Sequence, residues 1–185
     1  MTRISPRLDL ASVTRQNIGT LRRLNGVILP GGFRAWLRGS PNAQLVPYSD
    51  GVYEQVQAPE LEDFCKLVYY NDIPVGSVCC RIDDGKLYIM ILAVLAPYRR
   101  EGLGRYMLEH ILHAAVSDPV PIVKGDKVQP RKKLESVYMH VHVENEDALN
   151  FYKAHGFQVV QEVKEYYKRM KGDGNRDAYV LSKQL

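Results

Sequence analysis

The sequence is poor in cysteine and has no cysteine–histidine spacing of the kind that holds zinc. It contains three cysteines, Cys65, Cys79 and Cys80. Because neighbours on a strand point to opposite faces, Cys79 and Cys80 are not expected to bridge each other. All three are interpreted as buried, reduced side chains that act as small apolar groups. These shortages argue against a disulfide framework, and no metal site is predicted.

Long apolar runs and a strong charge of one sign are also missing. No stretch approaches the roughly 18 consecutive apolar residues of a transmembrane helix, and residues 1–6 lack the apolar centre of a signal peptide. The formal net charge is +4, a mild excess that fits an anionic cofactor or a ribosomal neighbourhood without establishing nucleic-acid binding. We expect a cytoplasmic protein, with the nucleus as a second compartment left open.

The composition is that of an ordinary globular protein. Hydrophobic residues make up 45% of the chain and charged residues 25%, and 185 residues suit one domain with a substantial core. No internal repeat or low-complexity tract divides the chain. We therefore expect a single domain over residues 1–185.

Hydrophobic periodicity predicts an α/β fold with a mixed, mostly antiparallel sheet of about seven strands and helices on both faces. A cap at Thr14 is expected to begin the first helix. The predicted strands are 8–10, 66–70, 73–82, 86–95, 136–143, 157–166 and 177–183. The first predicted helix follows Thr14 and stops near Pro30, and the others are 50–57, 105–116 and 146–155; the loops are 31–47 and 118–134.

The segment between strand 86–95 and the next helix reads Arg99-Arg100-Glu101-Gly102-Leu103-Gly104. Glycines there let the backbone approach a ligand closely, and the free N–H groups of a helix N-terminus bind anionic oxygens. The spacing lacks the Lys-Ser/Thr of a nucleoside-triphosphate loop and the third glycine of a dinucleotide fingerprint. An anion-binding turn and a plain glycine-rich turn both fit this segment alone.

A second motif lies at residues 145–157, where Asn145, Ala148, Tyr152, Gly156 and Phe157 fit the pattern Asn-x-x-Ala-x-x-x-Tyr-x-x-x-Gly-Phe. The two motifs, in this order and context, resemble the two signatures of the GNAT superfamily of acetyltransferases. This resemblance implies the GNAT fold, acetyl-CoA as the cofactor with CoA as product, and a pyrophosphate-binding role for residues 99–104.

A closer resemblance covers most of the chain and is to the catalytic subunits of N-terminal acetyltransferase E. It implies acetylation of nascent chains that begin with Met and a hydrophobic residue. It also implies association with the N-terminal acetyltransferase A complex on ribosomes, without a membrane or a required nucleic acid. The segments that carry it are Arg23-Leu24-Asn25, Tyr70-Asn71-Asp72-Ile73, Val78-Cys79-Cys80-Arg81, Leu87-Tyr88-Ile89-Met90, Leu95-Ala96-Pro97-Tyr98-Arg99-Arg100, Tyr138-Met139-His140-Val141 and Tyr166-Tyr167-Lys168-Arg169.

Acetyl transfer to an amine needs a base, and Tyr88 and His140 are the candidates. His140 has a suitable intrinsic pKa, whereas Tyr88, with a reference pKa of about 10, would act through an ordered water. The resemblance supports both as a catalytic pair; a packing tyrosine and a structural histidine are the alternatives. Strand alternation is expected to group Tyr88 with Met90, Leu92 and Val94, and His140 with Tyr138 and a non-participating His142.

The resemblance also assigns residues to the coenzyme. Tyr152 would hydrogen-bond or protonate the departing sulfur, unless it only packs on its helix face. Asn145 would contact the coenzyme, cap its helix, or do both. The backbone of Leu92 to Val94 would bind the pantetheine arm and supply an oxyanion donor. Arg99, Arg100, Gly102, Leu103 and Gly104 would hold the pyrophosphate.

For the acceptor peptide, the resemblance implies that Tyr166 and Tyr167 hold the substrate backbone. Tyr88, Met90 and His140 would line the same side. Two segments compete for the pocket of the first residue, Leu29-Pro30 and Val46-Pro47-Tyr48, because an insertion at about residues 31–47 interrupts the substrate loop. Both alternatives stay open.

The preferred function is an acetyl-CoA-dependent N-terminal protein acetyltransferase that works by direct transfer within a ternary complex. Lysine or small-amine acetylation by the same fold is one alternative. A weakly active, coenzyme-binding assembly subunit of an acetyltransferase complex is another. A lysine enzyme would favour acidic residues in its acceptor groove, because it must deprotonate an amine of pKa about 10.4.

Overall fold

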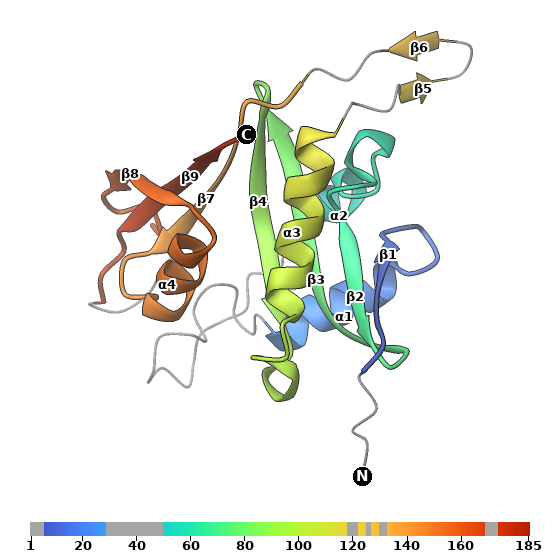
Figure 1. The fold of residues 1–185 in the computed structure, drawn as a ribbon, viewed down its shortest axis with the longest axis horizontal. Coiled ribbons are helices and arrows are strands. Elements are labelled where there is room, and N and C mark those ends of the chain that lie inside the picture. Colours follow the sequence, from blue (N-terminus) through green and yellow to red (C-terminus); the bar gives the residue numbers. More distant parts are fainter. Residues whose placement is uncertain (1–5, 29–49, 118–121, 125–126, 130–132, 169–173) are drawn as a thin grey trace.

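The structure is a computed structural model that describes residues 6–28, 50–117, 122–124, 127–129, 133–168 and 174–185. Its centre is a seven-stranded sheet in the order β1-β2-β3-β4-β7-β9-β8 (Figure 1). Only β4 and β7 are parallel neighbours, so the predicted mixed, mostly antiparallel sheet is confirmed. The strands are β1 (Leu8–Ser12), β2 (Lys66–Tyr70), β3 (Ile73–Asp83), β4 (Lys86–Val94), β7 (Ser136–His142), β8 (Gln158–Val163) and β9 (Ala178–Gln184).

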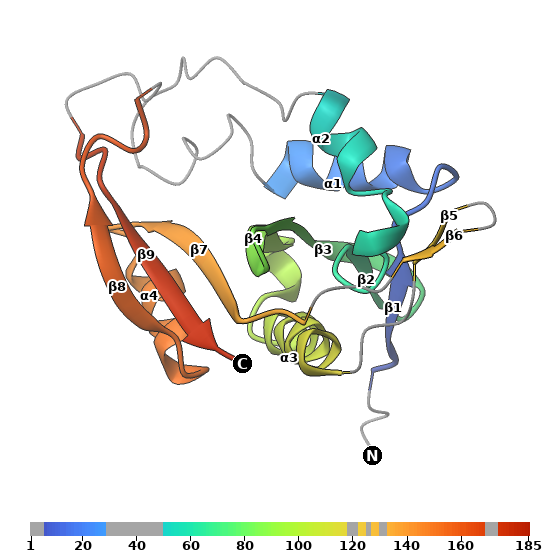
Figure 2. The same ribbon diagram turned by 90° about the horizontal axis from the view of Figure 1, so that it is seen from above.

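Helices cover both faces of the sheet, as predicted. Helices α1 (Ile18–Ile28) and α2 (Asp50–Gln55) lie on one face, and α3 (Leu103–Val116) and α4 (Glu146–Ala154) lie on the other (Figure 2). No helix in the described part of the chain is long and apolar enough to cross a bilayer. The apolar stripes of α1 and α3 supply core side chains, namely Leu21, Leu24, Met107, Leu108 and Ile111. Two single turns of 3₁₀ helix span Pro59–Leu61 and Ala96–Tyr98.

The start of α1 differs from the prediction. The side chain of Asn17, not that of Thr14, organises the turn before the helix. Its Oδ1 accepts a hydrogen bond from the Thr14 backbone N–H at 2.7 Å, and its Nδ2 donates to the Ser12 carbonyl at 2.8 Å. The helix therefore begins at Ile18, after a turn that ties it to the end of β1.

Two further predicted elements differ from the structure in their bounds. The predicted loop 118–134 contains a small antiparallel hairpin, β5 (Ile122–Lys124) and β6 (Lys127–Gln129). The strand predicted to run to Tyr166 ends at Val163, so Tyr166 lies in the turn that follows. Tyr166 and Tyr167 have a high strand propensity, but the charged residues Lys164 and Glu165 separate them from Val163.

The three cysteines are free and fully buried, as predicted. The Cys65 thiol donates a hydrogen bond to the Cys80 carbonyl at 3.4 Å. Burial raises the pKa of the Cys80 thiol well above its ordinary value, so this side chain stays protonated and packs as a small apolar group.

A bulge in β4 breaks the simple alternation of its side chains. Cys79 on β3 pairs with Ile91, but the next residue, Cys80, pairs with Ile89. Met90 is therefore the extra residue of the bulge, between the residues that pair with Cys79 and Cys80. Because strand alternation restarts at such a residue, Tyr88 and Leu92 take opposite faces although they are four residues apart.

Contacts identify the two faces. The Ser77 hydroxyl of β3 lies 3.2 Å from Asn25 Oδ1 of α1, and Arg81, on the same face as Ser77, covers the ring of Tyr88. Tyr88 therefore faces the α1 side. Leu92 faces α3, because its Cδ2 lies 3.8 Å from the point where Gly104 would carry a Cβ. The predicted common face of Tyr88, Met90, Leu92 and Val94 is thus wrong beyond the bulge.

Strands β4 and β7 are paired only at their beginnings. The parallel register joins Lys86, Leu87 and Tyr88 to Ser136, Val137 and Tyr138 and then stops, although both strands continue. Figures 1 and 2 show the two ribbons diverging from that point. Beyond Tyr88, the main-chain groups of β4 that face this side have no partner on β7, and a ligand can bind to them.

The close pairing of β3 with β4 requires glycine at position 76. A Cβ there would lie 2.4 Å from the Ala93 carbonyl oxygen, a backbone atom that cannot move aside cheaply. We expect Gly76→Ala to lower the free energy of unfolding by about 1–3 kcal/mol, measured by chemical denaturation. Gly19→Ala on α1 is the control, since nothing lies within 4 Å of its Cβ position; it should be neutral or stabilising. Equal stability of Gly76→Ala and the parent protein would show that the two strands can separate at this position without cost.

Candidate active site

Three aromatic side chains meet where β4 and β7 part. Tyr88 comes from β4, His140 from β7 and Tyr166 from the turn after β8. The Tyr88 hydroxyl lies 3.3 Å from His140 Nδ1 and 3.3 Å from the Tyr166 hydroxyl. The rings of His140 and Tyr166 stack with centroids 4.1 Å apart and planes 9° from parallel. The structure thus brings together the two predicted bases and one predicted peptide-binding tyrosine.

The environment sets the protonation of this cluster. Burial, followed by the hydrogen bond with Tyr166, raises the pKa of Tyr88, so the phenol stays protonated at neutral pH. Burial, followed by the positive charge of Arg81, lowers the pKa of His140 below its ordinary 6.5. His140 is therefore a neutral imidazole at neutral pH, and its Nε2 makes no hydrogen bond to any described residue. Such a group can accept a proton from an amine.

Three residues behind the cluster support Tyr88. The Arg81 guanidinium lies 4.4 Å from the centroid of the Tyr88 ring, and its Nε donates to both Asp83 oxygens at 2.9 and 3.0 Å. The Tyr138 hydroxyl donates to Asp83 Oδ2 at 2.8 Å, and the Tyr138 ring lies 4.9 Å from that of Tyr88. The sequence motifs did not reveal Arg81 and Asp83 as site residues; the pairing of Arg81 with Tyr88 across the β3–β4 hairpin is the signal that could have found them.

Tyr152 approaches from the opposite face of the sheet, on α4. It is only 7% exposed and packs edge-on against Phe151 and Phe157. Burial, followed by the nearby Cys80, raises its pKa, so the phenol is a hydrogen-bond donor. Its hydroxyl has no hydrogen-bond partner among the described residues. The packing alternative therefore holds for the ring, while the hydroxyl stays available to a ligand.

Asn145 caps α4, since its Oδ1 accepts a hydrogen bond from the Ala148 backbone N–H at 3.0 Å. The capping interpretation is confirmed. The side-chain Nδ2 has no partner among the described residues and can still donate to a ligand.

The turn between β4 and α3 has the geometry of an anion site. Gly102 precedes the helix with φ +81°, and no atom lies within 4 Å of the place where it would carry a Cβ. The first N–H groups of an α-helix such as α3 lack intrahelical partners and can bind an anion. Leu103 is buried in the core, so only its backbone can contact a ligand there. Arg99 and Arg100 are both exposed, and Arg99 donates from Nε to the Val94 carbonyl at 3.1 Å.

The acceptor side is described in part. Tyr167 lies beside Tyr166, with ring centroids 4.9 Å apart, and Met90 is the bulged residue next to Tyr88 along β4. The two segments predicted to compete for the pocket of the first residue lie outside the described residues, so their alternatives stay predictions. They comprise Leu29, Pro30, Val46, Pro47 and Tyr48.

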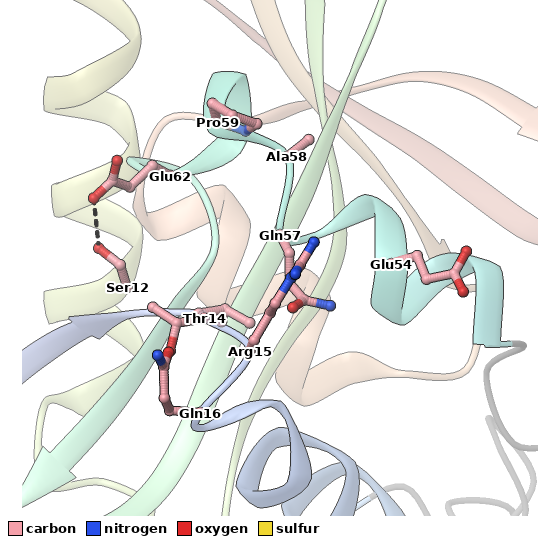
Figure 3. A pocket seen from close by; sticks show the side chains of 10 residues that line it. Ser12, Thr14, Arg15, Gln16, Glu54, Gln57, Ala58, Pro59 and Glu62 are labelled. Carbon is pink, nitrogen blue, oxygen red and sulfur yellow. Dashed lines mark hydrogen bonds between the residues drawn. The ribbon is translucent and has the colours of Figure 1, made fainter.

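A separate cleft of about 700 Å³ lies between the β1–α1 turn and the segment around α2 (Figure 3). Its lining includes Arg15, Glu54 and Glu62, and Ser12 donates a hydrogen bond to Glu62 at 3.3 Å. None of the predicted site residues lines it, and its lining has no histidine or cysteine. The candidate catalytic residues therefore lie where β4 and β7 diverge, and not in this cleft.

Comparison with known proteins agrees with this site. A family model described as an acetyltransferase (GNAT) domain matches residues 62–159, a span that includes both sequence motifs. The chain is 39% identical to N-alpha-acetyltransferase 50 of Danio rerio, over 97% of this chain and 89% of that protein. It is also 39% identical to the probable N-acetyltransferase san of Drosophila melanogaster, over 100% of this chain and 84% of that protein.

Among solved structures, the fold is similar to that of Arabidopsis thaliana Naa50 in complex with the bisubstrate analogue CoA-Ac-MVNAL. The TM-score is 0.73 and the sequence identity 33%, with 98% of this chain and 100% of the other covered.

The lowered pKa of His140 predicts a pH dependence. If His140 must be neutral, protonation of His140 lowers kcat/KM only at pH values below its ordinary pKa of 6.5. Arg81 disfavours the imidazolium, so Arg81→Gln should raise the pKa of His140 and move this acid limb to higher pH. The measurement is the ratio of variant to parent kcat/KM across pH on one peptide, because the titration of the peptide amine then cancels.

A matched control is Arg22→Gln. Arg22 also lies over a tyrosine ring, that of Tyr53 at 4.5 Å, and pairs with Asp50, but it lies on α1 away from His140. The acid limb of the Arg22→Gln pH profile should coincide with that of the parent protein. If the acid limb of Arg81→Gln also stays at the parent position, Arg81 does not lower the pKa of His140.

Proposed function

We propose, on the premise that this chain belongs to the GNAT acetyltransferases and within them to the N-alpha-acetyltransferase 50 family, that it transfers the acetyl group of acetyl-CoA to the α-amino group of protein N-termini. The observation that carries the proposal is the Tyr88–His140–Tyr166 cluster, which stands where the two parallel strands part. The preferred substrate begins with Met and a hydrophobic residue. The Met-Val sequence of the analogue bound to the Arabidopsis relative supports this preference.

The residues present fit acetyl-CoA. The open turn at Gly102 and the N-terminus of α3 suit its pyrophosphate, with Arg100 beside them. The unpaired edge of β4 beyond Tyr88 suits the amides of the pantetheine arm. Bound there, the coenzyme supplies an acetyl thioester, whose carbonyl is open to attack by an amine.

Proton removal comes first on the acceptor side. An α-ammonium has a pKa of about 8 and must become a free amine before it attacks. His140 is neutral at neutral pH, and its Nε2 can accept that proton directly or through a water. Nδ1 of the same ring then carries the hydrogen and donates it to the Tyr88 hydroxyl oxygen at 3.3 Å, while the Tyr88 hydroxyl can donate to Tyr166. Apo hydrogen bonds of this length commonly shorten once a substrate is bound.

The remaining charges develop on the other side of the reacting carbon. Backbone N–H groups of β4 between Leu92 and Val94 can stabilise the developing oxyanion. Tyr152 keeps its proton because its pKa is raised, so its hydroxyl can donate to the departing sulfur. The amine attacks the thioester directly. This supports transfer within a ternary complex, without a covalent acetyl-enzyme intermediate. The buried cysteines do not participate.

The described acceptor side disfavours lysine as the main substrate. Around His140 lie the rings of Tyr88, Tyr138 and Tyr166, and the nearby carboxylate of Asp83 is already paired with Arg81. A site for lysine side chains would gain from free carboxylates, because they would attract the ammonium group. The assembly-subunit alternative is disfavoured by the intact constellation of Tyr88, His140 and Tyr152.

The decisive test is acetyl transfer by the purified protein to Met-Leu-, Met-Lys- and Ser- peptides and to an N-blocked peptide with an internal lysine. We expect Met-Leu- to be the best substrate and the blocked peptide to be poor. His140→Gln should lower kcat by about 10²–10⁴-fold with unchanged coenzyme binding. Preference for the blocked peptide would establish the lysine alternative. Coenzyme binding without turnover on any peptide would establish the assembly alternative.

We further infer that the protein works beside the N-terminal acetyltransferase A complex on ribosomes, in the cytoplasm and with a second pool in the nucleus. The family relationship and the mild positive charge of +4 support this inference. The tagged protein should co-purify with that complex and sediment with ribosomes at low salt, and fluorescence of the tagged chain should appear in both compartments. Isolation of the chain alone at low salt would contradict the partnership.

A further inference from the structure

His142 is a fully buried histidine whose two ring nitrogens are both engaged. It is 0% exposed and ends β7, two residues after His140. Its Nδ1 accepts a hydrogen bond from the Glu144 backbone N–H at 3.2 Å, and its Nε2 lies 2.8 Å from the Asn175 carbonyl oxygen. The sequence motifs assigned this residue no part in the site.

These partners determine the tautomer. A backbone N–H can only donate, so Nδ1 must present its lone pair to Glu144. A carbonyl can only accept, so Nε2 must carry the proton and donate it to Asn175. The ring is therefore neutral with its proton on Nε2, and it links the end of β7 to the segment that leads into β9.

That segment is hydrogen-bonded to the turn that carries the tyrosine pair. The Tyr167 N–H donates to the Arg176 carbonyl at 3.0 Å, and the Glu165 N–H donates to Asp177 Oδ1 at 2.9 Å. The Arg176 side chain pairs with the Glu165 carboxylate at 3.2 Å. Residues 164–167 and 175–177 are thus bound to each other. His142 attaches the pair to the end of β7, together with the Val143 N–H, which donates to the Asp177 carbonyl at 3.2 Å. We call these two segments the acceptor latch.

The acceptor latch determines where the tyrosine rings lie. Tyr166 stacks on His140 at 4.1 Å and reaches the Tyr88 hydroxyl at 3.3 Å. The Tyr167 ring lies 5.5 Å from that of His142 itself. Glu165 adopts φ +52°, a conformation that non-glycine residues adopt only when their surroundings hold them. The position of the tyrosines therefore depends on contacts outside their own turn.

We propose that His142 is a positioning residue of the acceptor site: through its bond to Asn175 it holds the acceptor latch on β7 and places Tyr166 over His140 for the incoming peptide. The inference rests on the proposed function, because the acceptor is taken to be a peptide N-terminus. Loss of this bond loosens the Asn175 end of the acceptor latch, although Val143 still holds Asp177. It does not touch the coenzyme side, which lies on the opposite face of the sheet. The expected signature is a raised KM for the peptide at unchanged affinity for the coenzyme.

Two substitutions test the two hydrogen bonds of His142 separately, because each retains one bond and removes the other. The Nε2 of glutamine is as many bonds from Cα as histidine Nε2, so His142→Gln retains a donor for Asn175 and loses the acceptor for Glu144. The Oδ1 of asparagine corresponds to histidine Nδ1, so His142→Asn retains the acceptor and loses the donor. We expect His142→Asn to raise the peptide KM about tenfold, the effect of one lost hydrogen bond. His142→Gln should stay within about twofold of the parent KM.

His113→Asn, at an exposed position on α3, is the control for the exchange itself and should match the parent protein. Hydrogen exchange tests the acceptor latch without any activity. Amides of residues 164–168 and 174–177 should exchange faster in His142→Asn than in His142→Gln, while those of β3 and β4 stay unchanged.

An unchanged peptide KM in His142→Asn, or equal exchange in the two His142 variants, would overturn the proposal. So would a fall in coenzyme affinity together with faster exchange throughout the sheet, since that would mark general damage to the fold. Absence of N-terminal acetylation by the parent protein would instead refute the proposed function, and the exchange experiment would still decide the role of His142.

Discussion

The parting of β4 from β7 after Tyr88 is the constraint on which the rest of the structure depends. Parallel strands ordinarily satisfy each other's backbone groups along their length, yet here the register ends after three residue pairs. The gap leaves polar main chain for a ligand and lets side chains from both strands approach the same space. The sheet stays intact on either side because β3 pairs closely with β4 and β9 pairs along the whole of β7.

Burial gives this opening its chemical character. Removal from water disfavours the charged forms of both Tyr88 and His140, so one remains a protonated phenol and the other a neutral base. Arg81 adds a positive charge that acts in the same direction on His140 and is itself held by Asp83. The acceptor latch then brings Tyr166 onto the imidazole from a distant part of the chain. The site is therefore assembled from three separate stretches of sequence.

Local patterns predicted much of this arrangement. The order of strands and helices, the glycine turn before α3, the capping of α4 by Asn145 and the meeting of Tyr88 with His140 all follow from periodicity, turn chemistry and the family resemblance. Other features depend on contacts that no local pattern contains. The extra residue at Met90 is visible only in the pairing with β3, and the role of Asn17 competes with an equally good cap at Thr14. The linkage of His142 to Asn175 joins residues 33 positions apart.

The bulge at Met90 has a consequence for the movement of protons. Before the bulge Tyr88 shares the α1 face with His140 of β7, and after it Leu92 faces α3. Tyr152 approaches from the α4 face, so the base and the acid lie on opposite sides of the sheet. Among the described residues no hydrogen bond links His140 and Tyr88 to the Tyr152 hydroxyl. The hydrogen that His140 takes from the amine and the one that Tyr152 gives to the sulfur are therefore different ones. After every turnover His140 must release its proton to solvent on one face, and Tyr152 must take one from solvent on the other. The two proton transfers are independent and act on the same acetyl group from opposite faces.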